Sequence, residues 1–161
     1  MLSIEHVRAR LRRPLPGHAA QALMMPRPRG GRLPARGRLR NAGVLILLFP
    51  RDETELALVL IRRAAHADRP DPHSGQLALP GGRQETGESL SATALRETAE
   101  EVGVDRCRIR LLAALTPLEI PVSGHRVQPF IGYCAPTPRF RPDPSEVAGI
   151  VQWPLHRLLD G

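Results

Sequence analysis

Apolar and polar positions along the chain predict a sheet that is interrupted by one strong helix. Two continuous apolar runs, residues 43–49 and 56–61, flank a polar turn that begins at Pro50, a pattern typical of a buried β-hairpin. Residues 90–102 instead place apolar side chains at helical spacing. Shorter apolar stretches predict extended segments at 76–79, 109–115, 127–134 and 150–153, and a final helix from 155 to 159. Strands precede and follow the main helix, so the order favours a mixed α/β sandwich over repeated βαβ units.

The N-terminal quarter of the chain has a different pattern. Apolar residues recur at helical spacing in residues 3–13, and Ser3 can cap the start of this predicted helix. Residues 14–40 are rich in proline, glycine and arginine and show no apolar periodicity, which predicts a linker or an extended arm. We therefore divide the chain into a helix with a basic arm, residues 1–40, and one globular domain, residues 41–161.

Charge separates the same two parts. The 161 residues include 23 arginines, no lysine and 16 acidic residues, which gives a formal net charge of +7. Ten of the arginines and only one acidic residue lie in residues 1–40. A basic segment can contact nucleic acid, but this one has no interleaved aromatic residue for base stacking. We therefore expect a solvated or substrate-side arm rather than a nucleic-acid partner.

Length and composition exclude several classes of protein. A chain of 161 residues can bury one sizeable core. The longest unbroken apolar run, residues 44–49, is far shorter than the roughly 20 residues that a membrane span needs, so no membrane partner is expected. No secretory signal pattern opens the chain, and Cys107 and Cys134 do not make a disulfide framework. These features favour a cytoplasmic location, with both cysteines as small core residues.

The helix predicted at 90–102 carries a cluster of carboxylates. At 100° per residue, Glu97 and Glu101 lie side by side at the edge of the apolar, sheet-facing arc, and Glu100 lies about 60° beyond Glu97. Like charges this close repel, so such a cluster is favoured mainly where cations neutralise it. Oxygen-only ligands select hard ions such as Mg²⁺ or Mn²⁺. On these three residues alone, a solvated acidic face remains an equally good interpretation.

The surrounding residues favour the metal site. Gly103 follows the helix and suits a left-handed cap, and a glycine pair, Gly81 and Gly82, precedes the loop that leads into it. The spacing G-x5-E-x7-R-E-U-x-E-E-x-G-U is reproduced, with Thr98 at its first aliphatic position, by Gly82, Glu88, Arg96, Glu97, Glu100, Glu101, Gly103 and Val104. In this motif, over residues 82–104, the chain resembles the Nudix hydrolases.

The resemblance implies a Nudix-type α/β/α sandwich with a mixed sheet and hydrolysis of a nucleoside diphosphate linked to another group. It implies that Mg²⁺ or Mn²⁺ is bound by Glu97, Glu100 and Glu101, with the Gly82 backbone close to the metal. Arg96 and Glu88 match the ion pair that supports the loop and helix. The general base is expected to be Glu100 or, from a proline-rich loop that can fold over the cleft, Glu146.

Residues around the motif are similar to one subgroup, the coenzyme A pyrophosphatases. The similarity lies in residues 60–64 and 73–82 and continues in parts of 123–155, so that it covers about residues 42–157. It implies cleavage of coenzyme A or its derivatives to 3′,5′-ADP and 4′-phosphopantetheine. The substrate-binding residues expected on this basis are Arg63, Arg62, Arg69, Gly75, Gln76 and Gly81. Arg63 is preferred for a substrate phosphate because Arg69 lies in a loop that is longer than in that subgroup.

Two alternatives stay open at this level. The chain can be a Nudix hydrolase of another nucleotide, such as ADP-ribose or a dinucleotide. It can also be a Nudix-fold binding or regulatory module that uses its basic arm on nucleic acid, although a pure binder has no need for a repulsive carboxylate cluster. A small-molecule substrate is expected in the first two cases, with the protein as a monomer or a homodimer.

Overall fold

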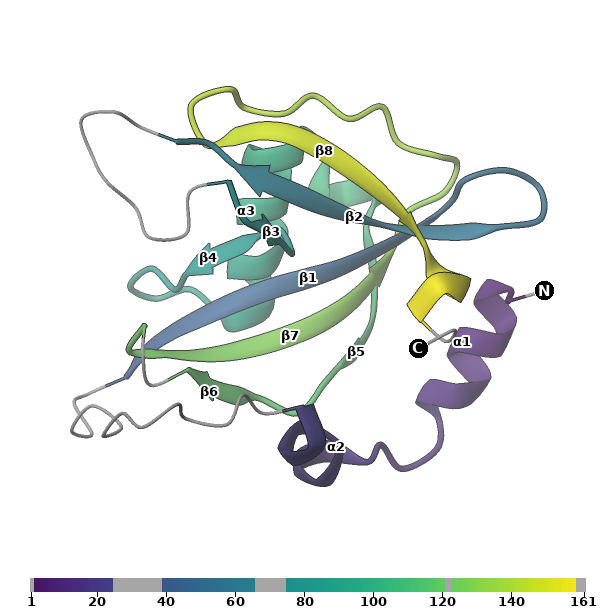
Figure 1. Cartoon of the computed structure of the whole chain (residues 1–161), viewed down its shortest axis with the longest axis horizontal. Coiled ribbons are helices and arrows are strands. Elements are labelled where there is room, and N and C mark those ends of the chain that lie inside the picture. Colours follow the sequence, from purple (N-terminus) through teal and green to yellow (C-terminus); the bar gives the residue numbers. More distant parts are fainter. Residues whose placement is uncertain (1, 25–38, 66–74, 121–122, 159–161) are drawn as a thin grey trace.

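A computed structural model describes residues 2–24, 39–65, 75–120 and 123–158 (Figure 1). Three α-helices and two 3₁₀ turns are present in this part: α1 (Ile4–Leu11), α2 (Gly17–Met24), α3 (Leu90–Val102), η1 (Arg106–Arg108) and η2 (Leu155–Leu158). The strands are β1 (Arg40–Pro50), β2 (Leu56–Arg63), β3 (Leu77–Ala78), β4 (Gly81–Arg83), β5 (Arg110–Ala114), β6 (Leu118–Ile120), β7 (His125–Tyr133) and β8 (Val147–Pro154). They form one sheet of eight strands, and this sheet is mixed, as the resemblance implies.

The sheet forks along β1. Near the predicted hairpin turn β1 pairs with β2, from Leu48 opposite Leu58 to Pro50 opposite Leu56. The first part of β1 pairs instead with β4, from Ala42 opposite Arg83 to Val44 opposite Gly81. On its other edge β1 pairs in parallel with β7, and β7 also pairs with β5 and β6. Strand β2 pairs in addition with β3 and β8. The β2–β8 pair therefore diverges from the β1–β7 pair (Figure 1), and the segment before β4 lies at the fork.

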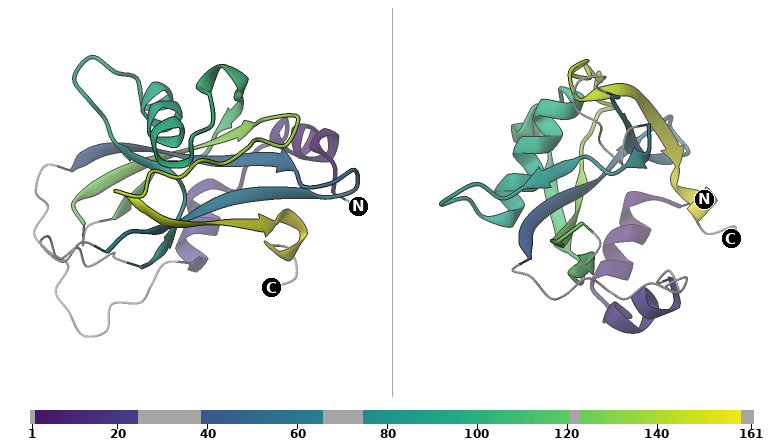
Figure 2. Two further views of the ribbon diagram at one scale, coloured as in Figure 1. Left: turned by 90° about the horizontal axis from the view of Figure 1, so that it is seen from above. Right: turned by 60° about the vertical axis from the view of Figure 1, so that its left-hand side comes forward.

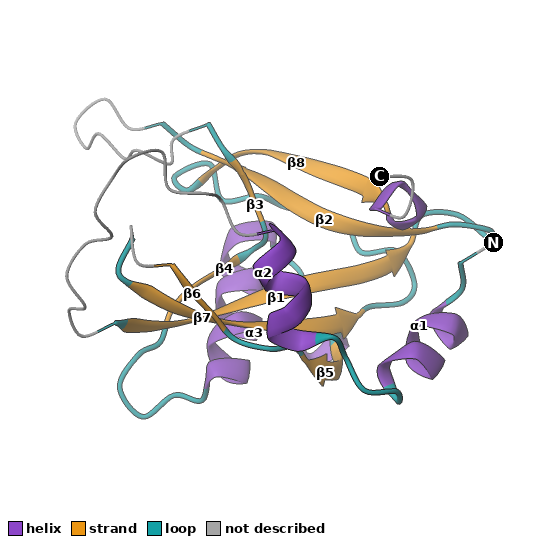
Figure 3. Ribbon diagram, turned by 60° about the horizontal axis from the view of Figure 1, so that its bottom comes forward, coloured by secondary structure: helices purple, strands orange, loops and turns teal. Residues whose placement is uncertain are grey.

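Helix α3 packs on one face of β1, behind the sheet in Figure 3, where α2 lies in front. Alternate residues of β1, Leu45, Leu47 and Phe49, are fully buried and cluster with Ala94 and Val102 of α3. The helix approaches the strand closely at Gly43, where an added Cβ would stand 2.3 Å from the carbonyl oxygen of Leu90. This close packing fixes the helix, and with it the carboxylates on its edge, against the fork.

Local signals in the sequence account for both bounds of α3 and for the start of α1, which ends at Leu11, earlier than predicted. Ser89 caps α3 by accepting a hydrogen bond from the Ala92 N–H, and Gly103 ends it in the left-handed conformation (φ 70°). Helix α3 has the predicted bounds, residues 90–102. Ser3 likewise caps α1 through the His6 N–H, as predicted.

Several expectations are corrected. The arm at 14–40 is not wholly a linker or extended, because residues 17–24 form α2, whose alanines and leucine are good helix formers, and β1 already begins at Arg40. The rest of the arm, residues 25–38, lies outside the described residues. Strands β4 and β6 were not predicted, because three residues each give no readable periodicity. The final helix is the short 3₁₀ turn η2, and Cys107 is exposed whereas Cys134 is buried.

Helices α1 and α2 lie against the sheet near β5 without burying a side chain fully, and in the right-hand view of Figure 2 they lie across the sheet from α3. The Gln21 side chain donates to the Thr116 carbonyl at 2.8 Å, and the Arg8 guanidinium lies 5.9 Å from the centre of the Tyr133 ring. No helix in the described ranges is long and apolar enough to cross a membrane.

Deletion of residues 1–36 should therefore leave the domain folded. The polar contacts named for α1 and α2, one hydrogen bond and one cation–π contact, are worth only about 1–2 kcal/mol together, and neither helix has a fully buried side chain in the described residues. We expect a small fall in the free energy of unfolding, unchanged metal-dependent turnover and, at low salt, a raised KM for an anionic substrate. Urea titration and kinetics at two salt concentrations check this. A truncated chain that fails to fold would show that the arm is a packed part of the domain.

Candidate active site

Glu101 is the most deeply buried carboxylate of the site. Its side chain projects from α3 toward the fork, with 2% of the residue exposed, and accepts a hydrogen bond from the Gly81 N–H at 2.8 Å. The pKa of Glu101 is raised to about 7, chiefly by burial: the hydrogen bond from the Gly81 N–H and the charge of Arg63 act to lower it, and the charges of Glu97 and Glu146 add to the rise. A carboxylate in this setting is ready to exchange a proton for a cation near neutral pH.

Glu97 lies one turn earlier on α3, against the second glycine of the pair. An added Cβ at Gly82 would stand 2.4 Å from the Glu97 carboxyl carbon, so only glycine leaves room for this carboxylate at the strand. Burial also raises the pKa of Glu97, with smaller contributions from the charges of Glu100 and Glu146 and an opposing one from Arg96. Gly81 thus donates its N–H to Glu101, and Gly82, which has no side chain, leaves space for the carboxylate of Glu97.

Arg96 connects the acidic cluster to the loop before the helix. Its Nη1 lies 3.0 Å from Glu97 Oε1 and 3.0 Å from Glu100 Oε2, and its Nη2 donates to the Arg83 carbonyl at 3.2 Å. Its Nε lies 3.0 Å from Glu88 Oε1, so the ion pair that the resemblance implies is present. Arg96 therefore fixes the loop, the helix and the two more accessible carboxylates relative to one another.

Glu88 is held as a charged group by these contacts. The hydrogen bond from Arg96 lowers its pKa to about 2, with help from the Thr93 hydroxyl, which donates to Glu88 Oε2 at 2.8 Å. Thr93 itself is fully buried on α3. Glu88 thus positions the loop and does not face the fork as a ligand.

Replacement of Glu88 by glutamine should make the protein less stable at pH 7, and the difference should vanish in acid. Because the folded pKa is below the unfolded value of 4.5, the charged form stabilises the fold above that pH, and this contribution is lost as the pH falls from about 4.5 to about 2. Thermal unfolding at pH 7 and pH 3 for the variant and for E85Q, an exposed neighbour, measures the effect. A difference that stays constant across this range would exclude the ion pair as its source.

Four further residues predicted from the sequence lie around the end of β2: Arg63, Gly75, Gln76 and Glu146. The charge of Glu146, which is exposed just before β8, acts on Glu97 and Glu101, and its carbonyl accepts from the Ala64 N–H at 2.8 Å. The charge of Arg63, at the end of β2, also acts on Glu101. The backbone of Arg63 pairs with both Gly75 and Gln76, at 3.0 and 3.1 Å, so these two residues join the same end of the sheet.

Two predicted residues are placed differently. Arg62 is exposed, and its guanidinium lies over Gly149 of β8, where an added Cβ would be 3.4 Å from Nη2. Since side chains alternate along a strand, Arg62 and Arg63 face opposite sides of β2. Arg69 lies outside the described residues, and its role stays a prediction.

The donor chemistry of this site fits a hard divalent cation. Glu97, Glu100 and Glu101 offer only oxygen ligands on one strip of α3, and burial of two of them leaves negative charge that a cation would neutralise. Within the described ranges, no three acidic, histidine or cysteine side chains already converge on one point. Arg96 takes up one oxygen of Glu97 and one oxygen of Glu100, and the second oxygen of each carboxylate is not part of these ion pairs.

Two features of the site were not predicted from the motif. The Gly81 N–H hydrogen bond to Glu101 joins residues 20 positions apart, and nothing in the local sequence reports it. Arg96 contacts Glu97 and Glu100 through Nη1, whereas its expected pair with Glu88 is made through Nε. The i, i+4 spacing of Arg96 and Glu100 is a sequence signal from which one of these two contacts could have been predicted. Thr98, the departure from the motif, is buried and donates to the Ala94 carbonyl at 2.7 Å, so its hydroxyl is satisfied.

Comparison with known proteins places this site in a family. The model of the NUDIX domain matches residues 39–160. The chain is 40% identical over 121 residues to an uncharacterized Nudix hydrolase, NudL, of Yersinia pestis; the match covers 74% of this chain and 58% of that protein. The chain thus spans little more than half the length of this relative.

Solved structures share the fold at low sequence identity. A Caenorhabditis elegans Ap4A hydrolase matches with a TM-score of 0.59 and 15% identity, over 76% of this chain and 85% of that one. The NUDIX domain of Shewanella oneidensis NrtR, solved with ADP ribose, matches with a TM-score of 0.55 and 22% identity, over 88% of this chain and 86% of that one. At these identities the similarity shows the α/β fold alone.

Proposed function

Because the chain belongs to the NUDIX domain family, we propose that it is a metal-dependent hydrolase that cleaves the pyrophosphate of coenzyme A or its derivatives. The products would be 3′,5′-ADP and 4′-phosphopantetheine. The observation that carries the hydrolase proposal is the placement of two carboxylates, the buried Glu101 and the partly buried Glu97, against the glycine pair at the fork of the sheet. The substrate rests on the similarity of residues 60–64 and 73–82 to the coenzyme A pyrophosphatases.

Each residue has a distinct task in this proposal. Glu97, Glu100 and Glu101 would hold a Mg²⁺ or Mn²⁺ ion, which would supply charge neutralisation at a pyrophosphate. Glu146, whose charge acts on Glu97 and Glu101, is the proposed general base and would accept the proton of the attacking water. Glu100 is the alternative base, since its side chain is half-exposed and pairs with Arg96.

The substrate is positioned from the end of β2 and from the glycine pair. Arg63 acts on the same carboxylate that Gly81 binds, so its positive charge lies beside the metal site and complements a phosphate there. Gly75 and Gln76, which pair with the Arg63 backbone, match the G-Q element of the coenzyme A subgroup and lie at the same end of β2. Arg62 and Arg69 complete the proposed set of phosphate-binding residues.

A second substrate class is kept because proteins of this fold include an Ap4A hydrolase and a domain solved with ADP ribose. Purified protein is incubated with coenzyme A, ADP-ribose or diadenosine tetraphosphate, each with Mg²⁺ or Mn²⁺, and the products are separated by chromatography. We expect 3′,5′-ADP from coenzyme A as the fastest reaction. Faster cleavage of ADP-ribose or the dinucleotide would transfer the proposal to that substrate, and no metal-dependent cleavage of any of them would favour a binding module.

Arg63→Ala tests the contact with the 3′-phosphate. A charge-assisted hydrogen bond to phosphate contributes roughly 1.5–3 kcal/mol, so kcat/KM for coenzyme A should fall by about tenfold or more, and less for 3′-dephospho-coenzyme A. Arg62→Ala, on the other side of β2, is measured with both substrates in parallel, and a larger loss on coenzyme A in that variant alone would assign the 3′-phosphate to Arg62. Equal losses on the two substrates in R63A would place Arg63 at the pyrophosphate instead, next to Glu101.

A further inference from the structure

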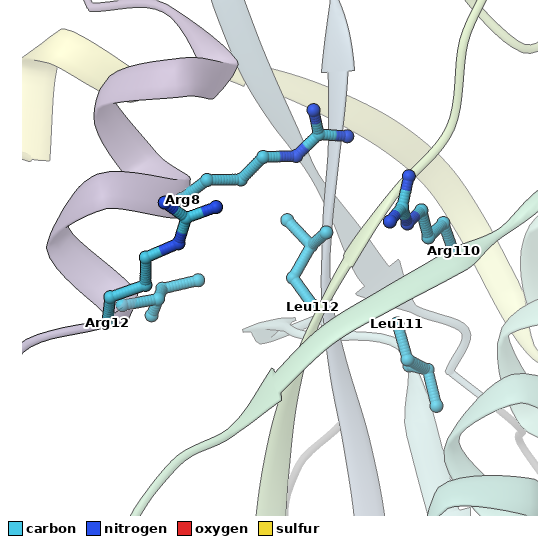
Figure 4. A pocket seen from close by; sticks show the side chains of 6 residues that line it. Arg8, Arg12, Arg110, Leu111 and Leu112 are labelled. Atoms are coloured by element: carbon cyan, nitrogen blue, oxygen red, sulfur yellow. The ribbon is translucent and has the colours of Figure 1, made fainter.

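A pocket of about 220 Å³ lies between α1 and β5, away from the carboxylates of α3 (Figure 4). Three arginines and three leucines line it: Arg8, Leu11, Arg12, Arg110, Leu111 and Leu112. Strand β7 shows which face of the sheet it occupies. Cys134 and Phe130 belong to the core beneath α3, so Tyr133 points to the opposite face, and Arg8 lies over its ring. We call this cavity the α1–β5 pocket.

The arginines of the α1–β5 pocket have little negative charge beside them: Glu5, three residues before Arg8 on α1, is near enough for their charges to interact, but the two form no ion pair. In the described part of the chain, none of the three forms an ion pair, whereas Arg96 pairs with three carboxylates and Arg51 pairs with Glu55 at 3.0 Å. Figure 4 shows Arg8 and Arg110 extending toward one another from the helix and the strand, with Leu112 between them. Three guanidinium groups gathered around one cavity repel each other, and a bound anion would remove that cost.

The pocket is also built to orient its charges. The Arg8 guanidinium lies over the Tyr133 ring, 5.9 Å from its centre, and such stacking limits the conformations of the side chain. Arg12 follows one helical turn later, and Arg110 approaches from β5. Leu11 and Leu112 add apolar side chains to the lining, whereas the side chain of Leu111 packs against the core beneath α3.

We propose that the α1–β5 pocket binds a phosphomonoester that carries a compact apolar group. Guanidinium groups are suited to phosphate because their N–H groups form paired hydrogen bonds to its oxygens. The leucine lining complements an apolar substituent, and the volume suits a small molecule rather than a polymer. The inference does not rest on the proposed hydrolysis, because it uses no residue of the candidate active site.

Binding to the full chain in metal-free buffer at low salt tests the proposal. Phenyl phosphate and inorganic phosphate are titrated by calorimetry, and we expect both to bind in the millimolar range or tighter, with phenyl phosphate the stronger. R110Q should weaken phenyl phosphate binding by at least about tenfold. R110K, which keeps the charge but loses the paired geometry, should lie between R110Q and the parent protein. Hydrolytic activity should be unchanged in both variants.

R10Q is the matched control, because Arg10 lies on α1, as Arg8 does, but does not line the pocket. Unchanged phosphate binding in R10Q together with weakened binding in R110Q supports the site. Equal losses in the two variants would mean that the overall positive charge attracts phosphate, and the pocket would be rejected. Absence of phosphate binding in the parent protein would also overturn the proposal. So would tight binding of a single-stranded oligonucleotide that R10Q and R110Q weaken alike, since that result assigns the arginines to a nucleic-acid surface.

Discussion

Replacement of Glu101 by glutamine should lower kcat by about a thousandfold, because the variant loses a metal ligand and several kcal/mol of charge stabilisation in the transition state. The amide has nearly the same shape and can still accept the hydrogen bond that the Gly81 N–H donates at 2.8 Å. Loss of activity would therefore reflect lost charge rather than lost packing. Glu97→Gln should behave in the same way, with partial recovery in excess Mn²⁺. Steady-state kinetics and metal titration by calorimetry measure both effects.

In the absence of metal, E101Q should be more stable than the parent protein, although its turnover is lower. Because burial raises the folded pKa of Glu101 to about 7 from 4.5, its ionisation destabilises the fold as the pH rises through this range. At pH 8 the cost is on the order of 2–3 kcal/mol. E101Q without metal should thus be more stable than the parent at pH 8 and no more stable at pH 4, and added Mg²⁺ should stabilise the parent alone.

Glu119→Gln is the control for this experiment, since Glu119 is exposed on β6. It should change neither turnover nor the response of stability to Mg²⁺. Near-native turnover in both the E97Q and E101Q variants would refute the metal mechanism. An E101Q variant that is inactive but less stable than the parent at pH 8 would show instead that the substitution damages the fold.

Glu146→Gln should separate proton transfer from metal binding. As the general base, Glu146 should be needed for turnover but not for affinity, so kcat should fall by roughly 10²–10⁴ while the metal affinity is kept. The acidic limb of the pH–rate profile should change as well, because that limb reports protonation of the base. Glu146 is exposed, and its backbone carbonyl holds the Ala64 N–H whatever the side chain, so the variant should fold normally.

Glu100→Gln is the matched variant for the base. Glu100 is half-exposed and bound through Arg96, and we expect weaker metal binding in this variant, with the shape of the pH–rate profile preserved. Near-native turnover in E146Q, combined with an altered acidic limb in E100Q, would transfer the base role to Glu100. Parallel losses of metal affinity in both would make Glu146 a further ligand.

The sequence by itself determined the elements whose causes are local. Helix α3 has the bounds that its apolar spacing, Ser89 and Gly103 predict, and the β1–β2 hairpin follows from two apolar runs around a polar turn. The pair of Arg96 with Glu88 could likewise be expected from the motif. The helical period alone placed Glu97 and Glu101 side by side, because one turn of helix separates them.

The tertiary structure decided how these parts act on each other. The two halves of β1 pair with different strands, and the resulting fork brings Gly81 to Glu101 and Gly82 to Glu97 across intervals that no local pattern spans. Strands β4 and β6 and helix α2 escaped prediction for the same reason, since short segments take their structure from the surface against which they pack. Burial, which depends on the whole fold, then raises the pKa of Glu101 toward neutrality, and the packing of α1 against β5 brings the arginines of the α1–β5 pocket together. Sequence fixes which charges are present, but desolvation and distance, which set their energies, arise only when the chain is folded.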